Sequence, residues 1–287
     1  MTSLSRLETP KTTIPQLFDR DLYKRRRQQL RSDSIYFKLS AEISKRLQER
    51  LSSLNQGFQT VCQIGQDQHL LQQYLTNFKK TDFFVQEGET LRFDEEALPF
   101  AANSFDLILH VLSLHAVNDV PGVLAQTLQC LKPDGLFLAA FIGEDSFQEL
   151  RTVLEAVELE HYQGISQRVS PWIRTRDAGS LLQRAGFAMP LTDCDRLEIF
   201  YPTLTMLLQD LKQAKATSFL MNRQTPPLTR SLLSKAENLY KERFWDEAQC
   251  GIKVSIDIVY MTGRRPSPNH QKALSPGSAK HHLSDFL

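Results

Sequence analysis

The stretch VCQIGQDQHLL, residues 61–71, has the residue types of a nucleotide-binding turn in which several positions are changed. A short apolar segment ends at Gly65, and a helical pattern follows at 69–78. Glycine at such a turn lets the backbone approach a ligand closely, because any β-carbon would intrude. Polar and charged residues occupy 66–69, where further glycines are usual. The sequence therefore predicts a ligand-binding turn that is crowded by side chains.

The elements that position this turn form an alternating pattern. Helical patterns lie between four apolar segments of strand length, at 58–65, 82–87, 104–114 and 135–143. Strands that alternate with helices predict an α/β fold with a mostly parallel sheet, whose connections are right-handed. Ligands of such sheets bind beyond the carboxyl ends of the strands.

The second half of the chain has a different pattern. Helices are expected at 145–160 and 176–186, and strands at 195–202 and 252–265, with further helical patterns between the two strands. This order predicts a late antiparallel strand pair and a helical cap, formed by about 145–186 and 203–250. An apolar residue at every fourth position from Ile35 to Leu51 predicts an amphipathic helix that packs on the sheet.

Composition excludes several classes of function. The 34 basic and 33 acidic residues give a net charge of +1, which predicts no nucleic-acid partner, and no apolar run is long enough to span a membrane. Four widely spaced cysteines without a CxxC pair predict no metal site. We expect a cytoplasmic protein with one domain at 17–265, a disordered start at 1–16 and a disordered tail at 266–287.

Six blocks of sequence resemble one family. They are FDRDLYKRRR, LPFAANSFDLIL, LSLHAVNDVPGVL, LKPDGLFLAAFIGEDSFQELR, SPWIRTRDAGSLLQRAGF and YPTLTMLLQDLK. The chain is similar to the class I S-adenosylmethionine-dependent methyltransferases with a Rossmann-like fold. Within that class it looks like the group of the malonyl-carrier-protein O-methyltransferase and the complex I assembly factor that hydroxylates an arginine. The assembly factor is the better match, above all in the first block and in GEDSFQELR.

The resemblance implies a site for S-adenosylmethionine. Its residues would be Gln63, Gly65, Glu87 at the ribose, Asp94 at the adenine and Ser113. Only one of the family's three loop glycines is present, and Gln63 replaces an acid, so the cofactor loop is degenerate. A neutral hydrogen bond is weaker than a charged one, which predicts weakened binding. Asp94 could instead be an exposed acid of a turn.

A short connection predicts that the sheet is trimmed after its second strand. Only GETLR separates Glu87 from Phe93, whereas a parallel crossover needs a dozen or more residues. The usual helix and third strand therefore do not fit there.

The substrate side of the predicted cleft carries one histidine and two arginines. Ser113, His115 and Asn118 lie at its mouth, and His115 is either a catalytic candidate or a residue that caps the next helix. Arg151 and Arg174 could clamp a carboxylate, or they could form surface ion pairs with Glu149 or Asp177. The basic cluster at 24–27 is either a solvated helix face or a docking patch.

Three hypotheses follow. In the first, the protein is a methyltransferase-family enzyme that acts on a protein or carrier-bound substrate, as part of complex I assembly. In the second, a non-catalytic relative binds a partner protein. In the third, the protein methylates a carboxyl group of a malonyl thioester.

Overall fold

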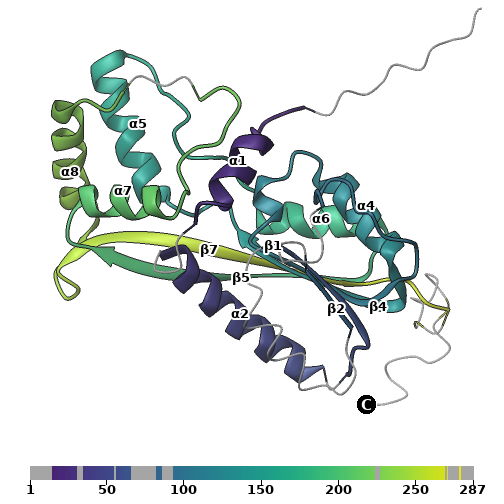
Figure 1. Ribbon diagram of the computed structural model, residues 1–287. Coiled ribbons are helices and arrows are strands. Elements are labelled where there is room, and N and C mark those ends of the chain that lie inside the picture. Colours follow the sequence, from purple (N-terminus) through teal and green to yellow (C-terminus); the bar gives the residue numbers. More distant parts are fainter. Residues whose placement is uncertain are drawn as a thin grey trace, which may run out of the picture.

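The computed structural model describes residues 15–30, 35–54, 56–65, 82–85, 93–223, 227–268, 270 and 278, and of 82–85 only the backbone. In this part of the chain one sheet has helices on both faces and further helices over one end (Figure 1). The strands are β1 (Thr60–Gly65), β2 (Asp82–Val85), β3 (Phe105–Val111), β4 (Leu131–Ile142), β5 (Ala188–Tyr201), β6 (Trp245–Asp246) and β7 (Gly251–Arg264).

The strand order is β2-β1-β3-β4-β7-β5, with β6 beside β7. Strands β2, β1, β3 and β4 are parallel, whereas β7 is antiparallel to both β4 and β5. The α/β fold with a mostly parallel sheet and a late antiparallel pair is thus confirmed. Strand β2 is the outermost described strand on its side, and no strand lies beyond it among the described residues.

Two helical layers cover the sheet, because alternate residues of each strand face opposite sides. Helix α2 (Ile35–Ser53) packs on the face that carries Leu107 and Leu109. Helices α4 (Val120–Cys130) and α6 (Thr175–Ala185) pack on the face that carries Ile108. The amphipathic helix predicted from Ile35 onward is therefore confirmed.

The cap consists of α5 (Gln148–Tyr162), α7 (Leu204–Gln213) and α8 (Arg230–Phe244). These helices share an apolar cluster with the ends of β5 and β7, including Tyr201 and Ile252. Strand β5 is longer than the predicted 195–202, because it begins at Ala188.

Helix α1 (Arg20–Arg27) lies between the cap and the α4–α6 layer (Figure 1). Phe18, just before it, packs with Phe219 and Leu220, which lie between α7 and α8, and Tyr23 packs with Ala116 in the short 3₁₀ helix after β3. The predicted helix at 69–78 lies outside the described residues, as do 1–14 and most of 266–287 in the termini that were expected to be disordered. The predicted domain boundaries stay a prediction. No described helix is both long and apolar enough to cross a membrane.

Candidate functional site

The carboxyl ends of β1 and β3 meet at Gly65. Gly65 has φ +93° and lies opposite Val111 in the register. A β-carbon built on Gly65 would lie 2.0 Å from the Val111 carbonyl oxygen and 3.1 Å from Ser113 Cβ. Glycine is therefore required here by strand packing as well as by its backbone angle. The loop at 66–69 lies outside the described residues.

Buried polar groups lie just behind this edge. Gln63 of β1 and His110 of β3 are both fully buried. The Ser113 hydroxyl lies 3.2 Å from His110 Nδ1. Burial lowers the pKa of His110 to about 3, so its imidazole is neutral at physiological pH.

The amide of Asn118 fixes the segment that precedes α1. Asn118 Oδ1 accepts hydrogen bonds from the backbone N–H groups of Leu17 (2.9 Å) and Phe18 (2.8 Å), and its Nδ2 donates to the Phe18 carbonyl at 3.1 Å. Arg20 Nη1 then donates to the Ala116 carbonyl at 2.9 Å. These contacts hold α1 across the carboxyl edge of the sheet.

Asp94 faces α1. Its Oδ2 accepts from Lys24 Nζ at 2.6 Å, and its Oδ1 accepts from Arg20 Nη2 at 2.8 Å and from the Glu96 N–H at 3.1 Å. Arg20 also pairs with the buried Glu95. Burial opposes the charge on Asp94, but the hydrogen bonds from Lys24, Glu96 and Arg20 outweigh it and lower the pKa to about 2. Both carboxylate oxygens are thus engaged within the protein.

His115 lies in a short 3₁₀ helix after β3 and is 7% exposed. Burial lowers its pKa to about 3, and the nearby Arg27 and Arg20 contribute in the same direction. Its Nδ1 is buried without a hydrogen-bond partner, and its ring meets the Tyr23 ring edge-on at 6.3 Å. Its imidazole is therefore neutral in a site that already holds two cations.

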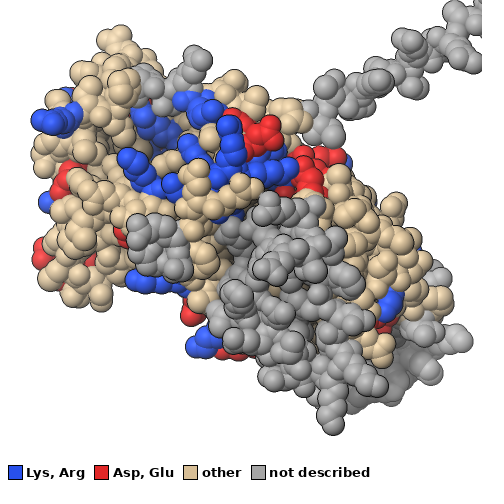
Figure 2. Space-filling view, viewed as in Figure 1, with Lys and Arg blue, Asp and Glu red and all other residues tan. Residues whose placement is uncertain are grey.

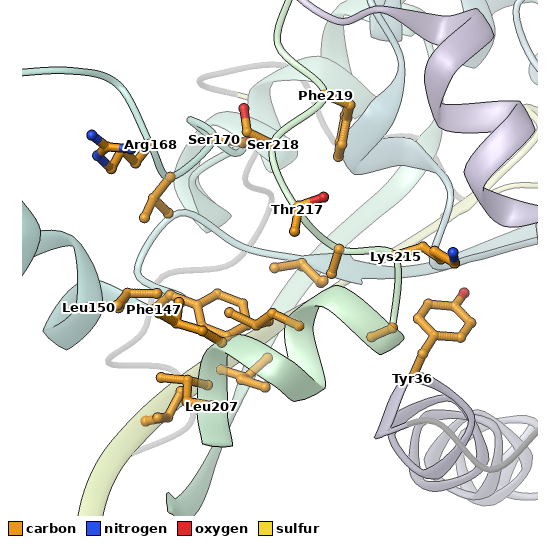
Figure 3. Close-up of a pocket in the computed structure, with 18 of the residues that line it drawn as sticks. Tyr36, Phe147, Leu150, Arg168, Ser170, Leu207, Lys215, Thr217, Ser218 and Phe219 are labelled. Carbon is orange, nitrogen blue, oxygen red and sulfur yellow. The ribbon is translucent and has the colours of Figure 1, made fainter. Parts of the chain in front are cut away.

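A cavity of about 310 Å³ separates the cap from α1, α2 and the sheet. Figure 3 shows Phe147, Leu150 and Leu207 on one side of it and Tyr36 on another. His115 and Ile142 bring the ends of β3 and β4 to this space. The lining includes Tyr23, Arg27, Trp172, Phe219 and Ile256 as well. The cavity is therefore mainly apolar and aromatic.

Four cations belong to the lining, and no described lining residue is an Asp or a Glu. Arg168 pairs with the buried Glu158 at 2.5 Å, and Arg223 pairs with Asp19 at 2.9 Å. The third is Lys215, and its charged end, like that of Arg168, points away from the apolar side chains in Figure 3. The fourth is Arg27, which is 8% exposed. On the surface, Lys and Arg side chains gather between the cap and α1 (Figure 2).

The candidate residues are only partly brought together. Gly65 and Ser113 adjoin, and α1 links Asp94 to the region of His115 through Arg20. Glu87 lies outside the described residues.

Arg151 and Arg174 do not line the cavity. Arg151 donates to the carbonyls of Glu144 and Ser170, and Arg174, whose side chain is 66% exposed, pairs with the Glu144 carboxylate. Arg174 thus pairs with Glu144 rather than with Glu149 or Asp177, and Arg151 bonds to two backbone carbonyls.

Sequence reasoning missed the aromatic and cationic residues at the inner end of the cavity. Tyr23 and Arg27 lie one turn apart on one face of α1, and Tyr36 lies in the first turn of α2. The four adjacent cations at 24–27 concealed this spacing, because adjacent helical residues cannot share one face.

Comparison with known proteins places the chain in a family. It is 31% identical over 288 residues to the mitochondrial arginine hydroxylase NDUFAF5 of Danio rerio. The matched region covers 94% of this chain and 89% of that protein. The human protein of the same name is 31% identical over 281 residues, with 92% and 81% covered. The chain belongs to the NDUFAF5 family.

Residues 45–139 of the chain match the family model described as a methyltransferase domain. A malonyl-[acyl-carrier protein] O-methyltransferase of Laribacter hongkongensis (strain HLHK9) is 28% identical, over 64% of this chain and 59% of that protein. Among solved structures, the YcgJ protein of Bacillus subtilis covers 77% of this chain and 98% of its own, with 13% identity and a TM-score of 0.44. The family-model match and the identity to the NDUFAF5 relatives confirm the resemblance to the class I methyltransferases.

Proposed function

We propose that this member of the NDUFAF5 family is an enzyme that modifies an apolar group presented by a protein or a carrier. The cavity beneath the cap is the observation that carries this proposal, because it joins an apolar space to the carboxyl ends of β3 and β4. Pockets of this size and lining commonly hold small ligands, and sheets of this type bind ligands at that edge. His115, at the inner end, can hydrogen-bond the reacting group.

S-adenosylmethionine is the cofactor in this proposal, and the described residues support its amino-acid end better than its adenine. Gly65 has no side chain at the junction of β1 and β3, which leaves its backbone accessible to a ligand, and Gln63 and Ser113 supply polar groups there. These three residues would hold the cofactor. Asp94 would serve the adenine only after Lys24 or Arg20 releases it. When bound, the cofactor supplies an electrophilic methyl group.

Hydroxylation of a protein arginine is a second candidate, favoured by the name and the 31% identity of the NDUFAF5 relatives. A guanidinium in the cavity would meet Tyr23 and Tyr36 but also the cation Arg27, with no acid among the described lining residues. The charges therefore favour the first candidate. A non-catalytic binding role is the remaining alternative.

A role in the assembly of respiratory complex I, in a cytoplasmic setting, completes the proposal. It rests on the resemblance of the FDRDLYKRRR and GEDSFQELR blocks. The partner would be a protein or a carrier domain that places its substrate group at the mouth of the cavity.

Calorimetric titration with S-adenosylmethionine and with S-adenosylhomocysteine tests the proposal. Micromolar affinity is expected, and no binding at millimolar ligand would contradict it and support the non-catalytic role. Asp106→Asn is the matched control for Asp94→Asn, because Asp106 also pairs with a lysine, Lys132, at 3.1 Å. A change of cofactor affinity in Asp94→Asn alone would be specific to the site rather than a general effect of the lost charge. Mass spectrometry of acyl-carrier and arginyl-peptide substrates then distinguishes an added methyl group from an added oxygen atom.

A further inference from the structure

We infer that the mouth of the cavity is a docking surface for an acidic protein segment that also carries apolar side chains. The surface consists of a cationic rim, formed by Arg26, Lys215 and Arg223, and of the exposed apolar pair Leu17 and Met221. The inference rests on the proposed function, in which a protein or a carrier presents the substrate, and it assigns the chemistry of that partner.

The cationic rim lies where α1 meets the segment that follows α7. Arg26 Nη1 donates to the carbonyl oxygens of Thr217 at 2.7 Å and of Ser218 at 2.9 Å, and both of these residues line the cavity. Lys215 and Arg223 line it as well. Cations gather between the cap and α1 in Figure 2, and the charged end of Lys215 points away from the apolar lining in Figure 3. The rim therefore borders the mouth of the cavity rather than its interior.

The rim carries more positive charge than its described partners neutralise. Arg26 makes no ion pair among the described residues, and Lys215 Nζ donates to the neutral Oε1 of Gln29 at 3.3 Å. Arg223 pairs with Asp19 at 2.9 Å. Burial lowers the pKa of Arg26, and the like charge of Arg223 contributes in the same direction, whereas the charge of Asp19 opposes the shift. A carboxylate from a partner would relieve this repulsion between neighbouring cations.

The apolar pair adjoins the rim. Phe18 and Leu220 form an antiparallel β-bridge, and next to it the Met221 N–H donates to the Leu17 carbonyl at 2.9 Å. Leu17 is 42% exposed and Met221 is 51% exposed, although both residues of the bridge are buried. Arg223 Nη1 donates to the Leu220 carbonyl at 3.1 Å, which brings a cation of the rim to the same bridge. Exposed apolar side chains beside arginine are typical of protein interfaces, so the surface suits an amphipathic protein segment better than a simple anion.

Binding of two labelled peptides to the full-length protein tests the inference. One peptide consists of four Glu-Glu-Leu-Ala repeats and the other of four Gln-Gln-Leu-Ala repeats, so they have equal length and equal leucine content. Fluorescence anisotropy should show that wild type binds the acidic peptide about tenfold more tightly at low salt, since a few exposed ion pairs together give a factor of this order. The preference should shrink as the NaCl concentration rises, because salt screens exposed charges.

The combined variant Arg26→Gln and Lys215→Gln should lose most of this preference. Its matched control is Arg176→Gln with Arg184→Gln, which removes the same number of charges. Both control arginines are exposed on α6, and neither lines the cavity. The control should retain the full preference. The ratio of the two affinities within one variant does not depend on the fraction of folded protein.

Leu17→Ser combined with Met221→Ser should weaken the binding of both peptides by a similar factor, because both peptides carry leucine. Unchanged affinities would remove the apolar pair from the surface. If wild type bound neither peptide or bound both equally, or if the rim variant kept the preference, the inference would be wrong, while the cofactor titration would still decide the proposed function. A thymidine oligonucleotide that bound as tightly as the acidic peptide would show a site for any polyanion and would overturn the inference as well. A preference for the acidic peptide without cofactor binding would support the docking surface and the non-catalytic role.

Discussion

The two ends of the buried face of α1 carry one arginine each, and the two arginines have different surroundings. Arg20 and Arg27 lie two helical turns apart and are both 8% exposed. Arg20 contacts acids, Asp94 and Glu95, and a backbone carbonyl. Arg27 lies over two tyrosine rings and borders a cavity.

The difference separates an arginine that fixes the fold through ion pairs from one that lines a cavity. A buried ion pair leaves a costly charge behind when one partner is removed. A contact between a guanidinium and an aromatic ring contributes less to stability. The same residue type on one helix therefore serves two purposes, and the predictions below test that division.

Arg20→Met should have the largest effect on stability. It leaves the buried Glu95 without its cation and breaks the bond to the Ala116 carbonyl, so we expect a loss of about 3–5 kcal/mol in the free energy of unfolding. Urea denaturation monitored by circular dichroism measures this loss. Arg25→Met, the exposed control, should change it by less than about 0.5 kcal/mol. If the two variants lost similar amounts of free energy of unfolding, the proposed structural role of Arg20 would be wrong.

Asn118→Ala should have the next largest effect. It removes the amide that holds the Leu17 and Phe18 N–H groups, and we expect a loss of about 1–2 kcal/mol. Hydrogen exchange of α1 amides should accelerate as well, because the helix loses its anchor to the sheet. Unchanged exchange in α1 would show that Phe18 and Tyr23 hold the helix without the amide.

Asp94→Asn tests the pH dependence of the ion-paired face. The folded pKa of Asp94, about 2, lies below its ordinary value of 3.8, so its charge stabilises the protein above about pH 4, and this contribution is lost as the pH falls toward 2. Because the carboxylate is partly exposed, we expect wild type to exceed the variant by only about 1 kcal/mol near neutral pH. Urea titrations across this range should show the difference shrinking at acid pH. A difference that grew on acidification would have the wrong sign.

Arg27→Met should have the smallest effect on stability. The cation–π contacts of about 0.5–1 kcal/mol are partly replaced by contacts of the methionine sulfur with the same rings, so the loss should be smaller than that of Arg20→Met. Thermal unfolding measures this loss. A loss as large as that of Arg20→Met would place both arginines in the same structural class.

The sheet was predictable because its signal is local. The apolar segments that became β1, β3 and β4 are buried on both faces, which gives continuous apolar runs in the sequence. Strand β5 was predicted too short because its first part alternates between half-buried and exposed residues such as Met189. An edge strand of this kind has a weak apolar signal.

The candidate site was less predictable because its contacts join distant parts of the chain. Asn118 binds the backbone of Phe18, 100 residues away in sequence. Arg174 pairs with Glu144, 30 residues away, rather than with a near neighbour. No local pattern reveals that α1 docks beyond the end of β3, so the position of Arg27 in the cavity lining could not be predicted from the cluster at 24–27.

Strand β7 has a consequence for any attempt to divide the protein. Its first residues, such as Ile252, belong to the cap cluster, whereas Ile258 and Val259 fill the cores on the two faces of the sheet. One continuous segment thus completes all three clusters. Thermal unfolding should accordingly be a single cooperative transition. A chimera that exchanges the cap helices α5, α7 and α8 must retain the native strand β7 (Gly251–Arg264).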